Sequence, residues 1–380
     1  MSERTHDPAA SRGSLVLITG TGRSGTSTVS GTLSHLGLHV PGPYLGANRS
    51  NPKGFFESKW AVKFHKRLHN RALINDFDGR PDAVRLVQEA ITPAFRDELH
   101  TFLDNVSNGH DQVVVKDPRT VWCQALWAEE AAEVGLSIRY LSMLRHPAEV
   151  LGSRTEYYAS GADDSRRRYY ATCSLGRWIN SCVVNERETR GESRTFVRYT
   201  DLLGDWRTVM RKVGDDLNIT YDTDLADGAA HPVDEFIDPD LRRVQVGWDD
   251  VDVPAHLRDI AEEVWQELGV LADTDGHDEG ASKRIDELGD AYAQTLRDAQ
   301  AIAHDASEQA TKKAKKAAVR EERKRVREAT GSGEDAHQVD VEEPEGPEPK
   351  GQEAPTESVR SAAVRLRGKA RAVASRMRSR

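Results

Sequence analysis

Residues 14–27 read SLVLITGTGRSGTS, and this stretch decides the fold. Its first six residues form a mostly apolar run, which predicts a strand buried on both faces of a sheet. The next eight residues contain three glycines, and Val29, Leu33 and Leu36 then recur at helical spacing. The stretch therefore predicts a strand, a glycine-rich loop and a helix in succession.

The alternation of strand and helix continues along the chain. Apolar runs of strand length occur at residues 112–115, 138–144 and 195–199, and each precedes a helical pattern of ten or more residues. This order predicts an α/β fold with a P-loop-like, mostly parallel sheet flanked by helices. The active site is expected at the carboxyl ends of the strands, where the connecting loops meet.

Apolar residues are spread unevenly over the 380 residues. Residues 14–272 hold almost all of the tryptophan, phenylalanine and long aliphatic runs, so we expect them to form one large α/β domain. Residues 1–13 are polar and are predicted to be disordered. Apolar residues at helical spacing predict one long charged helix over 280–330, and its heptad-like part at 285–306 could pair two chains. The basic end of this helix, 312–327, is either a solvated face or a contact for anions.

The C-terminal tail separates acidic from basic residues. Residues 331–357 are acidic and rich in glycine and proline, which predicts a disordered linker. Residues 358–380 predict a basic amphipathic helix that could lie on an anionic membrane surface, bind an acidic partner or fold back on the linker. Its apolar face consists of Val359, Ala363, Leu366, Ala370, Val373 and Met377.

Several protein classes are disfavoured by composition. The net charge of −9 is segregated along the chain and does not indicate a partner, and no specific nucleic acid is expected. The three cysteines show no CxxC spacing, so a disulfide scaffold is not expected. The apolar run at 15–19 is too short for a signal peptide or a membrane span, and we expect a cytoplasmic protein whose tail could also place it at the inner face of the membrane.

The loop at residues 20–27 is a candidate phosphate site. Successive backbone N–H groups and the helix dipole would point at one spot, which favours a bound phosphate over an ordinary tight turn. The glycine spacing fits a Walker A loop, but Thr26 stands where a lysine is expected. A nucleotide with a 5′-diphosphate-like group is therefore a better ligand than ATP.

The run Arg23-Ser24-Gly25-Thr26 resembles the phosphosulfate loop of sulfotransferases that use 3′-phosphoadenosine 5′-phosphosulfate (PAPS). In that family the loop reads Pro-Lys-Ser-Gly-Thr or Arg-Ser-Gly-Thr. The resemblance implies that Arg23 neutralises the phosphosulfate. It also implies that the 5′-phosphate is bound by the rest of the loop, namely Gly22, Ser24, Gly25, Thr26 and Ser27.

Two further motifs extend the resemblance. The segment RHPAEVLGS places Arg145 at the end of a predicted strand and Ser153 eight residues later, on a helix that begins at Pro147. Sulfotransferases use an arginine and a serine at this spacing to hold the 3′-phosphate of PAPS. The segment at 196–203 is similar to their Arg-Tyr-Glu-Asp-Leu segment, with Thr200 in place of glutamate. Together the motifs span about residues 15–205.

Lys116 follows a predicted buried strand and begins the charged turn Lys-Asp-Pro-Arg. This segment resembles the Lys-Asp-Pro segment of Golgi tyrosylprotein sulfotransferases and bacterial relatives, which implies that Lys116 contacts the bridging oxygen of the leaving group. The alternative is a salt bridge at the strand end, formed by Lys116 or Arg119 with a carboxylate. Asp117 is expected to orient the turn rather than to react.

Glu57 is the candidate base that takes the proton of the acceptor. It ends the segment NPKGFFE, which resembles the Gly-aromatic-aromatic-Glu segment of bacterial sulfotransferases, and its phenylalanine neighbours are expected to raise its pKa by desolvation. The alternative is that Glu57 is the anion at the start of the next helix. Weaker base candidates are His65, His35 and His146.

The sequence thus predicts a sulfotransferase that moves a sulfonyl group from the co-substrate PAPS to a hydroxyl or amine, with no metal. The acceptor could be a carbohydrate, a glycolipid, a glycopeptide or a small phenol, bound by variable segments such as 76–106 and 156–190. Two other hypotheses are a P-loop kinase of a small molecule or nucleotide, and a non-catalytic scaffold with a nucleotide fold. A kinase needs magnesium and a lysine near the γ-phosphate, whereas this loop has Arg23 and Thr26.

Overall fold

The computed structural model describes residues 12–47, 51, 53–158, 161, 163–226, 229–238 and 246–330. The chain divides into two compact units, of which the first ends at Glu308 and the second begins at Gln309. The structure describes none of residues 1–11, 331–357 and 358–380, which hold most of the predicted disorder and the predicted basic helix. Of the predicted disordered N-terminus, residues 12 and 13 are described, and Gly13 is the first residue of the first strand.

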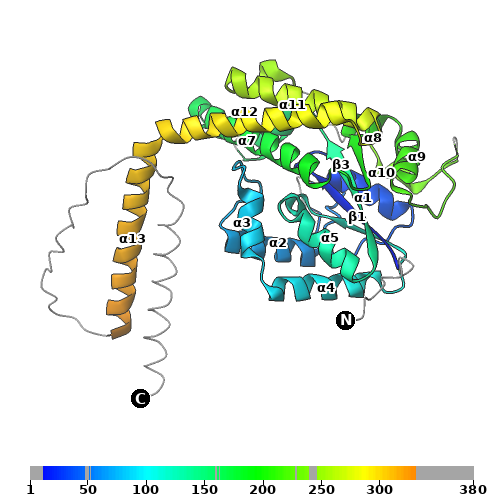
Figure 1. Ribbon diagram of the computed structural model, residues 1–380, viewed down its shortest axis with the longest axis horizontal. Helices are drawn as coiled ribbons and strands as arrows, with labels where there is room; N and C mark the ends of the chain where they lie inside the picture. Colours follow the sequence, from blue (N-terminus) through cyan, green and yellow to red (C-terminus); the bar gives the residue numbers. More distant parts are fainter. Residues whose placement is uncertain are drawn as a thin grey trace, which may run out of the picture. The chain divides into compact units, whose positions relative to one another are not determined.

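Four parallel strands form the sheet of the first unit, in the order β2-β1-β3-β4 (Figure 1). They are β1 (Gly13–Gly20), β2 (Gln112–Lys116), β3 (Leu136–Leu144) and β4 (Arg194–Arg198). The predicted α/β class and all four predicted strands are present, except that Tyr199 begins a helix instead of ending β4. Because the strands are parallel, their carboxyl ends lie at one edge, which places Lys116 and Arg145 at the same side as the glycine-rich loop.

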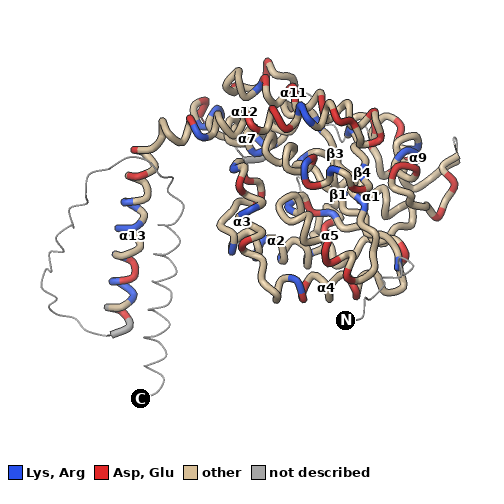
Figure 2. Tube along the Cα trace, viewed as in Figure 1, with Lys and Arg blue, Asp and Glu red and all other residues tan. Residues whose placement is uncertain are grey.

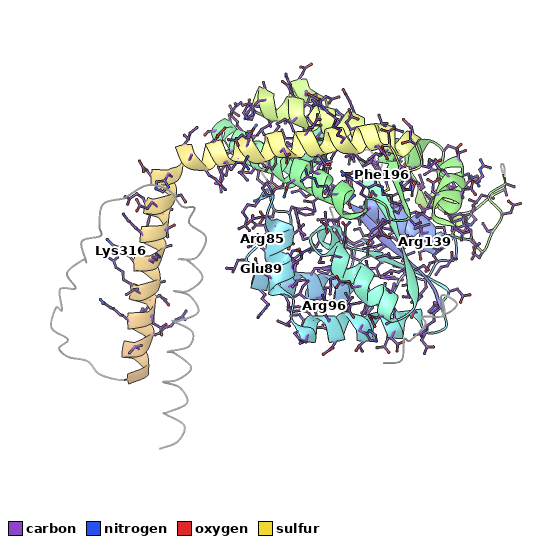
Figure 3. All side chains as sticks on the ribbon, in the orientation of Figure 1. Arg85, Glu89, Arg96, Arg139, Phe196 and Lys316 are labelled. Atoms are coloured by element: carbon purple, nitrogen blue, oxygen red, sulfur yellow. The ribbon has the colours of Figure 1, made fainter. Side chains whose placement is uncertain are left out.

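Both faces of the sheet are buried, as the apolar run in β1 predicts. Leu15 and Leu17 face a core formed with α2 (Lys59–Ala72), α3 (Ala83–Ala90), α4 (Pro93–Ser107), the short helix η1 (Pro118–Trp122) and α5 (Gln124–Glu133). Val16 and Ile18 face the other core, formed with α1 (Thr26–His35), α8 (Tyr199–Gly204), α9 (Trp206–Leu217) and α10 (Pro232–Phe236). On the outer surface, Arg96 of α4 forms an ion pair with Glu130 of α5 at 3.1 Å (Figure 3).

A third core lies beside β3 and β4. It is formed with α6 (Pro147–Tyr158), α7 (Asp164–Glu188), α11 (Ala255–Asp273) and α12 (Glu279–Ile302), and the short helix η3 (Trp248–Asp250) packs against it. Ile285, Leu288 and Tyr292 of α12 are buried in this core. The folded domain therefore extends beyond residue 272, because the apolar stripe of α12 packs against α7 and α11.

The long helix predicted over 280–330 is two helices, α12 and α13 (His304–Thr330), with Ala303 as a turn residue between them. Every described side chain of α13 is exposed, and basic and acidic residues alternate along it (Figure 2). Lys316 extends away from the helix axis (Figure 3). No helix in the described ranges is long and apolar enough to span a bilayer.

Candidate functional site

The glycine-rich loop lies between β1 and α1, and its backbone has the conformation that brings N–H groups together. Gly20 and Gly25 have φ of 117° and 93°, and Arg23 has φ of 76°, which is uncommon for a residue with a side chain. Ser24 closes the turn by hydrogen bonds from its N–H and its hydroxyl to the Thr21 carbonyl, at 3.2 and 2.5 Å. The first N–H groups of α1 then point at the loop, as in helix N-termini that bind phosphate.

Two aromatic rings pack directly on the glycines of the loop. A Cβ atom on Gly25 would lie 2.2 Å from the Tyr199 ring, and one on Gly22 would lie 2.6 Å from the Phe77 ring. The Arg154 guanidinium lies over the Phe77 ring at 4.5 Å. Phe77 and Arg154 could not be predicted as part of the site, because nothing in the local sequence pattern indicates that they reach the loop.

The two residues predicted to hold a 3′-phosphate meet the loop through Arg23. The Arg23 Nε donates a hydrogen bond to the Ser153 hydroxyl at 3.0 Å, and Arg145 Nη1 donates to the Arg23 carbonyl at 3.2 Å. Arg145 and Ser153 are both buried. Arg145 Nε also donates to Glu149 at 2.9 Å, a carboxylate that sequence analysis did not single out. Residues 122 to 130 positions apart in sequence are thus brought together.

A cavity of about 320 Å³ adjoins Arg145. His146 is one of the lining residues and is joined to Glu262 by a hydrogen bond of 3.1 Å. The Glu262 carboxylate also accepts a hydrogen bond from Trp248. The cavity is lined by Leu144, Arg145, His146, Glu149, Tyr199, Thr200, Val246 and Trp265. It therefore combines aromatic and aliphatic walls with one buried guanidinium.

Lys116 and Glu57, the two other predicted catalytic residues, form a buried ion pair. The Lys116 ammonium donates to Glu57 Oε1, to the Ser27 hydroxyl at 3.1 Å and to the Phe55 carbonyl at 3.4 Å. The strand-end salt bridge considered for Lys116 is therefore present, and its carboxylate is the predicted base itself. Three predicted site residues thus converge from β2, α1 and the segment before α2.

The segment before α2 holds Glu57 in place by packing. Phe56 has φ of 50°, and its ring lies 6.0 Å from Tyr44 and 5.6 Å from Phe236 between ring centroids. The Glu57 carbonyl accepts a hydrogen bond from the Leu45 N–H at 2.9 Å. The side chain of Glu57 is directed to Lys116, whereas the alternative prediction places it at the start of α2.

A buried polar chain supports the Lys-Asp-Pro-Arg turn. Asp117 accepts hydrogen bonds from the Arg119 N–H at 3.0 Å and the Arg119 side chain at 2.6 Å, and it bonds to His65 Nδ1 at 2.9 Å. Trp127 Nε1 donates to His65 Nε2 at 3.0 Å. Because an indole N–H only donates, His65 Nε2 is unprotonated and the ring is neutral, with its proton on Nδ1 facing Asp117.

The histidines considered as weaker base candidates have other positions. His65 has both ring nitrogens engaged and is fully buried, so it supports Asp117. His35 is exposed at the last turn of α1, against Phe236 at 5.0 Å between ring centroids. Among the described residues, no group of three histidine, cysteine or acidic side chains could hold a metal ion.

No protein-family model and no curated protein matches the sequence. Solved structures that are similar to it include three sulfotransferases. The sulfotransferase domain of the Synechococcus PCC 7002 olefin synthase has a TM-score of 0.39 and 18% identity, over 70% of this chain and 98% of that domain. The sulfotransferase domain of the curacin biosynthetic pathway has a TM-score of 0.39 and 14% identity, over 66% and 97%. Sulfotransferase STF1 from Mycobacterium tuberculosis H37Rv has a TM-score of 0.34 and 12% identity, over 59% and 70%.

Proposed function

We propose that this protein is a PAPS-dependent sulfotransferase that moves a sulfonyl group to a hydroxyl or amine acceptor. The observation that supports the proposal most directly is the convergence of Arg23, Arg145 and Ser153. An arginine from the phosphate loop, an arginine from the end of β3 and a serine from α6 are joined by hydrogen bonds of 3.0 and 3.2 Å. A site for one phosphate would need only the loop, whereas PAPS has phosphate groups at both its 5′ and its 3′ positions.

The residues around this point fit the donor. The glycine-rich loop and the start of α1 suit the 5′-phosphosulfate, and Arg145 with Ser153 suits the 3′-phosphate. The cavity beside Arg145 offers the Tyr199 and Trp265 rings as walls for the adenosine part. Arg145 is buried, so its charge acts on a bound phosphate with little screening by solvent.

In this proposal Lys116 stabilises the negative charge that develops on the leaving group, and Glu57 accepts the proton of the acceptor. The three contacts of the Lys116 ammonium use its three donor positions, so the ammonium must exchange Ser27 or the Phe55 carbonyl for an oxygen of the donor. Glu57 already contacts Lys116, which places the proton acceptor next to the group that assists departure. Sulfonyl transfer and proton removal would thus occur side by side.

The decisive measurement is calorimetric binding of 3′,5′-adenosine bisphosphate (PAP), the product that PAPS would leave, against ATP with magnesium. We expect the parent to prefer PAP without magnesium. We expect Arg145→Ala to bind PAP about 10- to 100-fold more weakly, because charge-assisted hydrogen bonds contribute about 1.5–3 kcal/mol. Arg139→Ala on the same strand is the matched control and should bind PAP like the parent. Preference for magnesium ATP would instead establish the kinase hypothesis, and no nucleotide binding the scaffold.

The proposal also covers the location of the protein and its partners. We propose a cytoplasmic enzyme whose tail at 358–380 attaches it to anionic membranes, and deletion of that tail should then abolish co-sedimentation with anionic vesicles. Self-association through 285–306 would have to use the outer part of α12, because Ile285, Leu288 and Tyr292 are buried within the chain. Ile302 has 88% of its surface exposed and is the apolar residue best placed for such a contact.

A further inference from the structure

Arg119 lies among three carboxylates next to the Lys116–Glu57 pair. Its guanidinium is 2.6 Å from Asp117, 3.0 Å from Asp76 and 4.0 Å from Glu57 Oε2, and only 14% of its side chain is exposed. Lys116 contacts the other oxygen of Glu57. Each oxygen of the Glu57 carboxylate thus faces a different cation, and this fixes the rotation of the carboxylate about its own axis.

The charges of this cluster are unevenly matched. The carboxylates of Glu57, Asp76 and Asp117 face the cations Lys116 and Arg119. The hydrogen bond from Trp127 keeps His65 neutral, and His69 lies 3.9 Å from Asp76. Burial alone lowers the pKa of Arg119, but Asp117 and Asp76 raise it above its ordinary value. Removal of Arg119 would leave Glu57 with Lys116 and without its second cationic neighbour. The Glu57 carboxylate would then no longer be held from both sides, by Lys116 at one oxygen and by Arg119 at the other, and the orientation of the Glu57–Lys116 pair would be less fixed.

Asp76 belongs to a loop, residues 75–80, that three other elements hold by its carbonyl groups. Trp122 donates to the Asp76 carbonyl at 3.0 Å, Asn180 of α7 donates to the Asp78 carbonyl at 2.9 Å, and Tyr292 of α12 donates to the Gly79 carbonyl at 2.6 Å. The loop is therefore fixed by side chains that are distant in sequence. Arg119 receives its orientation from this fixed loop as well as from its neighbour Asp117.

The same loop contacts the phosphate site. Phe77, which follows Asp76, packs on Gly22 of the glycine-rich loop, and Arg154 covers its ring. Phe77 thus touches the place where the donor is proposed to bind, and the side chain before it, Asp76, contacts Arg119. A shift of Phe77 against Gly22 would be passed to Asp76 through a single peptide unit.

We propose that Arg119, held by Asp76, is a positioning residue that fixes the Glu57–Lys116 pair, and that residues 75–80 link this pair to the phosphate loop. The role in transfer rests on the proposed sulfotransferase function, but the positioning itself is a property of the protein alone. Lysine at position 119 would keep one charge, yet an ammonium cannot form the planar, forked contacts that join Glu57, Asp76 and Asp117.

The test measures how fast Lys116 is acylated by an amine-selective reagent, followed by peptide mass spectrometry on the full-length protein. We expect Arg119→Ala to label Lys116 several-fold faster than the parent, because a loosened ammonium spends more time without its partners. Arg119→Lys should give an intermediate rate and covers the case in which Arg119→Ala does not fold. The exposed lysines Lys63 and Lys66 serve as internal standards in the same digest.

The matched control is Arg85→Ala, which removes an arginine that pairs with Asp82 and Glu89 on the surface of α3 (Figure 3). It should leave Lys116 labelling unchanged. A parental labelling rate in both Arg119 variants overturns the proposal. PAP should slow Lys116 labelling in the parent, and less so in Phe77→Ala, if the loop links the two sites; equal protection in both would remove the link.

These outcomes separate the two proposals. If the parent fails to bind PAP but Arg119→Ala still exposes Lys116, the proposed function is wrong and the positioning role stands. If PAP binds normally to Arg119→Ala and Lys116 labelling is unchanged, the positioning role is wrong and the proposed function stands. With both correct, Arg119→Ala keeps PAP affinity and loses about 100-fold in transfer rate, the effect of a small misplacement of reacting groups.

Discussion

The buried Lys116–Glu57 pair allows a test that separates stability from chemistry. Lys116→Met removes the cation and leaves Glu57, whose side chain is only 8% exposed, without its nearest partner. Loss of one member of a buried pair typically costs about 3–5 kcal/mol of folding free energy. Arg119 remains 4.0 Å from the carboxylate and offsets part of that loss, so we expect the lower end, about 3 kcal/mol.

The double variant Lys116→Met/Glu57→Leu should recover most of this stability. It replaces the pair by apolar side chains of similar volume, an exchange that is commonly neutral or stabilising by about 1–4 kcal/mol. Urea unfolding of the parent, Lys116→Met, Glu57→Leu and the double variant gives the coupling between the two positions. PAPS turnover should fall at least about 100-fold in every variant that lacks Lys116. A double variant no more stable than Lys116→Met would refute the reasoning.

Three other changes test particular contacts. Gly25→Ala should lower the unfolding free energy by at least roughly 1–3 kcal/mol and abolish PAP binding, because the new Cβ meets the Tyr199 ring and the backbone has a positive φ; unchanged calorimetry would contradict this. Trp127→Phe should cost about 1–3 kcal/mol in urea unfolding, because it leaves the buried His65 Nε2 without its donor. His69 and the Arg119 guanidinium outweigh burial and lower the pKa of Asp76 to about 2 from 3.8, so the stabilisation from Asp76 is present above pH 4 and is lost as the pH falls towards 2. The stability difference between parent and Asp76→Asn should therefore shrink over that interval, and a constant difference would show that the carboxylate is not involved.

The sheet and the position of the site could be predicted from sequence because parallel strands gather their carboxyl ends. The apolar run before Gly20 and the run before Lys116 identify β1 and β2, and the topology alone brings the residues after them together. Arg145 follows from the same argument on β3. What the pattern does not contain is the pairing of side chains across these ends, such as Glu57 with Lys116, because Glu57 comes from a segment without periodicity.

The contacts of residues 75–80 could not be predicted for a related reason. Asp-Phe-Asp-Gly has the composition of an ordinary surface turn, and its importance depends on Tyr292, which lies 213 positions from Gly79. His65 differs, because a signal was present: it follows Phe64 and precedes Leu68 on the apolar face of α2. A histidine on a buried face needs a hydrogen-bond partner for each ring nitrogen. The sequence therefore predicts two partners for His65, but it does not identify them as Asp117 and Trp127.

The break between α12 and α13 has no signal in the sequence. Ala303 lies in an alanine-rich stretch without proline or glycine, so helical spacing predicts an uninterrupted helix. The apolar side chains distinguish the two parts instead. Ile285, Leu288 and Tyr292 recur at the spacing of one face, whereas the described side chains of α13 are all exposed. Packing against α7 and α11 ends where that apolar face ends, and the boundary of the folded domain follows packing rather than helix length.

The buried cations of the site are already paired within the protein. Arg145 contacts Glu149, and Lys116 contacts Glu57, so neither charge is buried without a carboxylate. This arrangement follows from the cost of an uncompensated buried charge, which amounts to several kcal/mol. An anionic donor must therefore compete with internal carboxylates for the same cations. Its net gain comes from exchanging existing contacts of these cations for phosphate oxygens and from the loop N–H groups, so the affinity should depend on the geometry of the phosphates more than on their total charge.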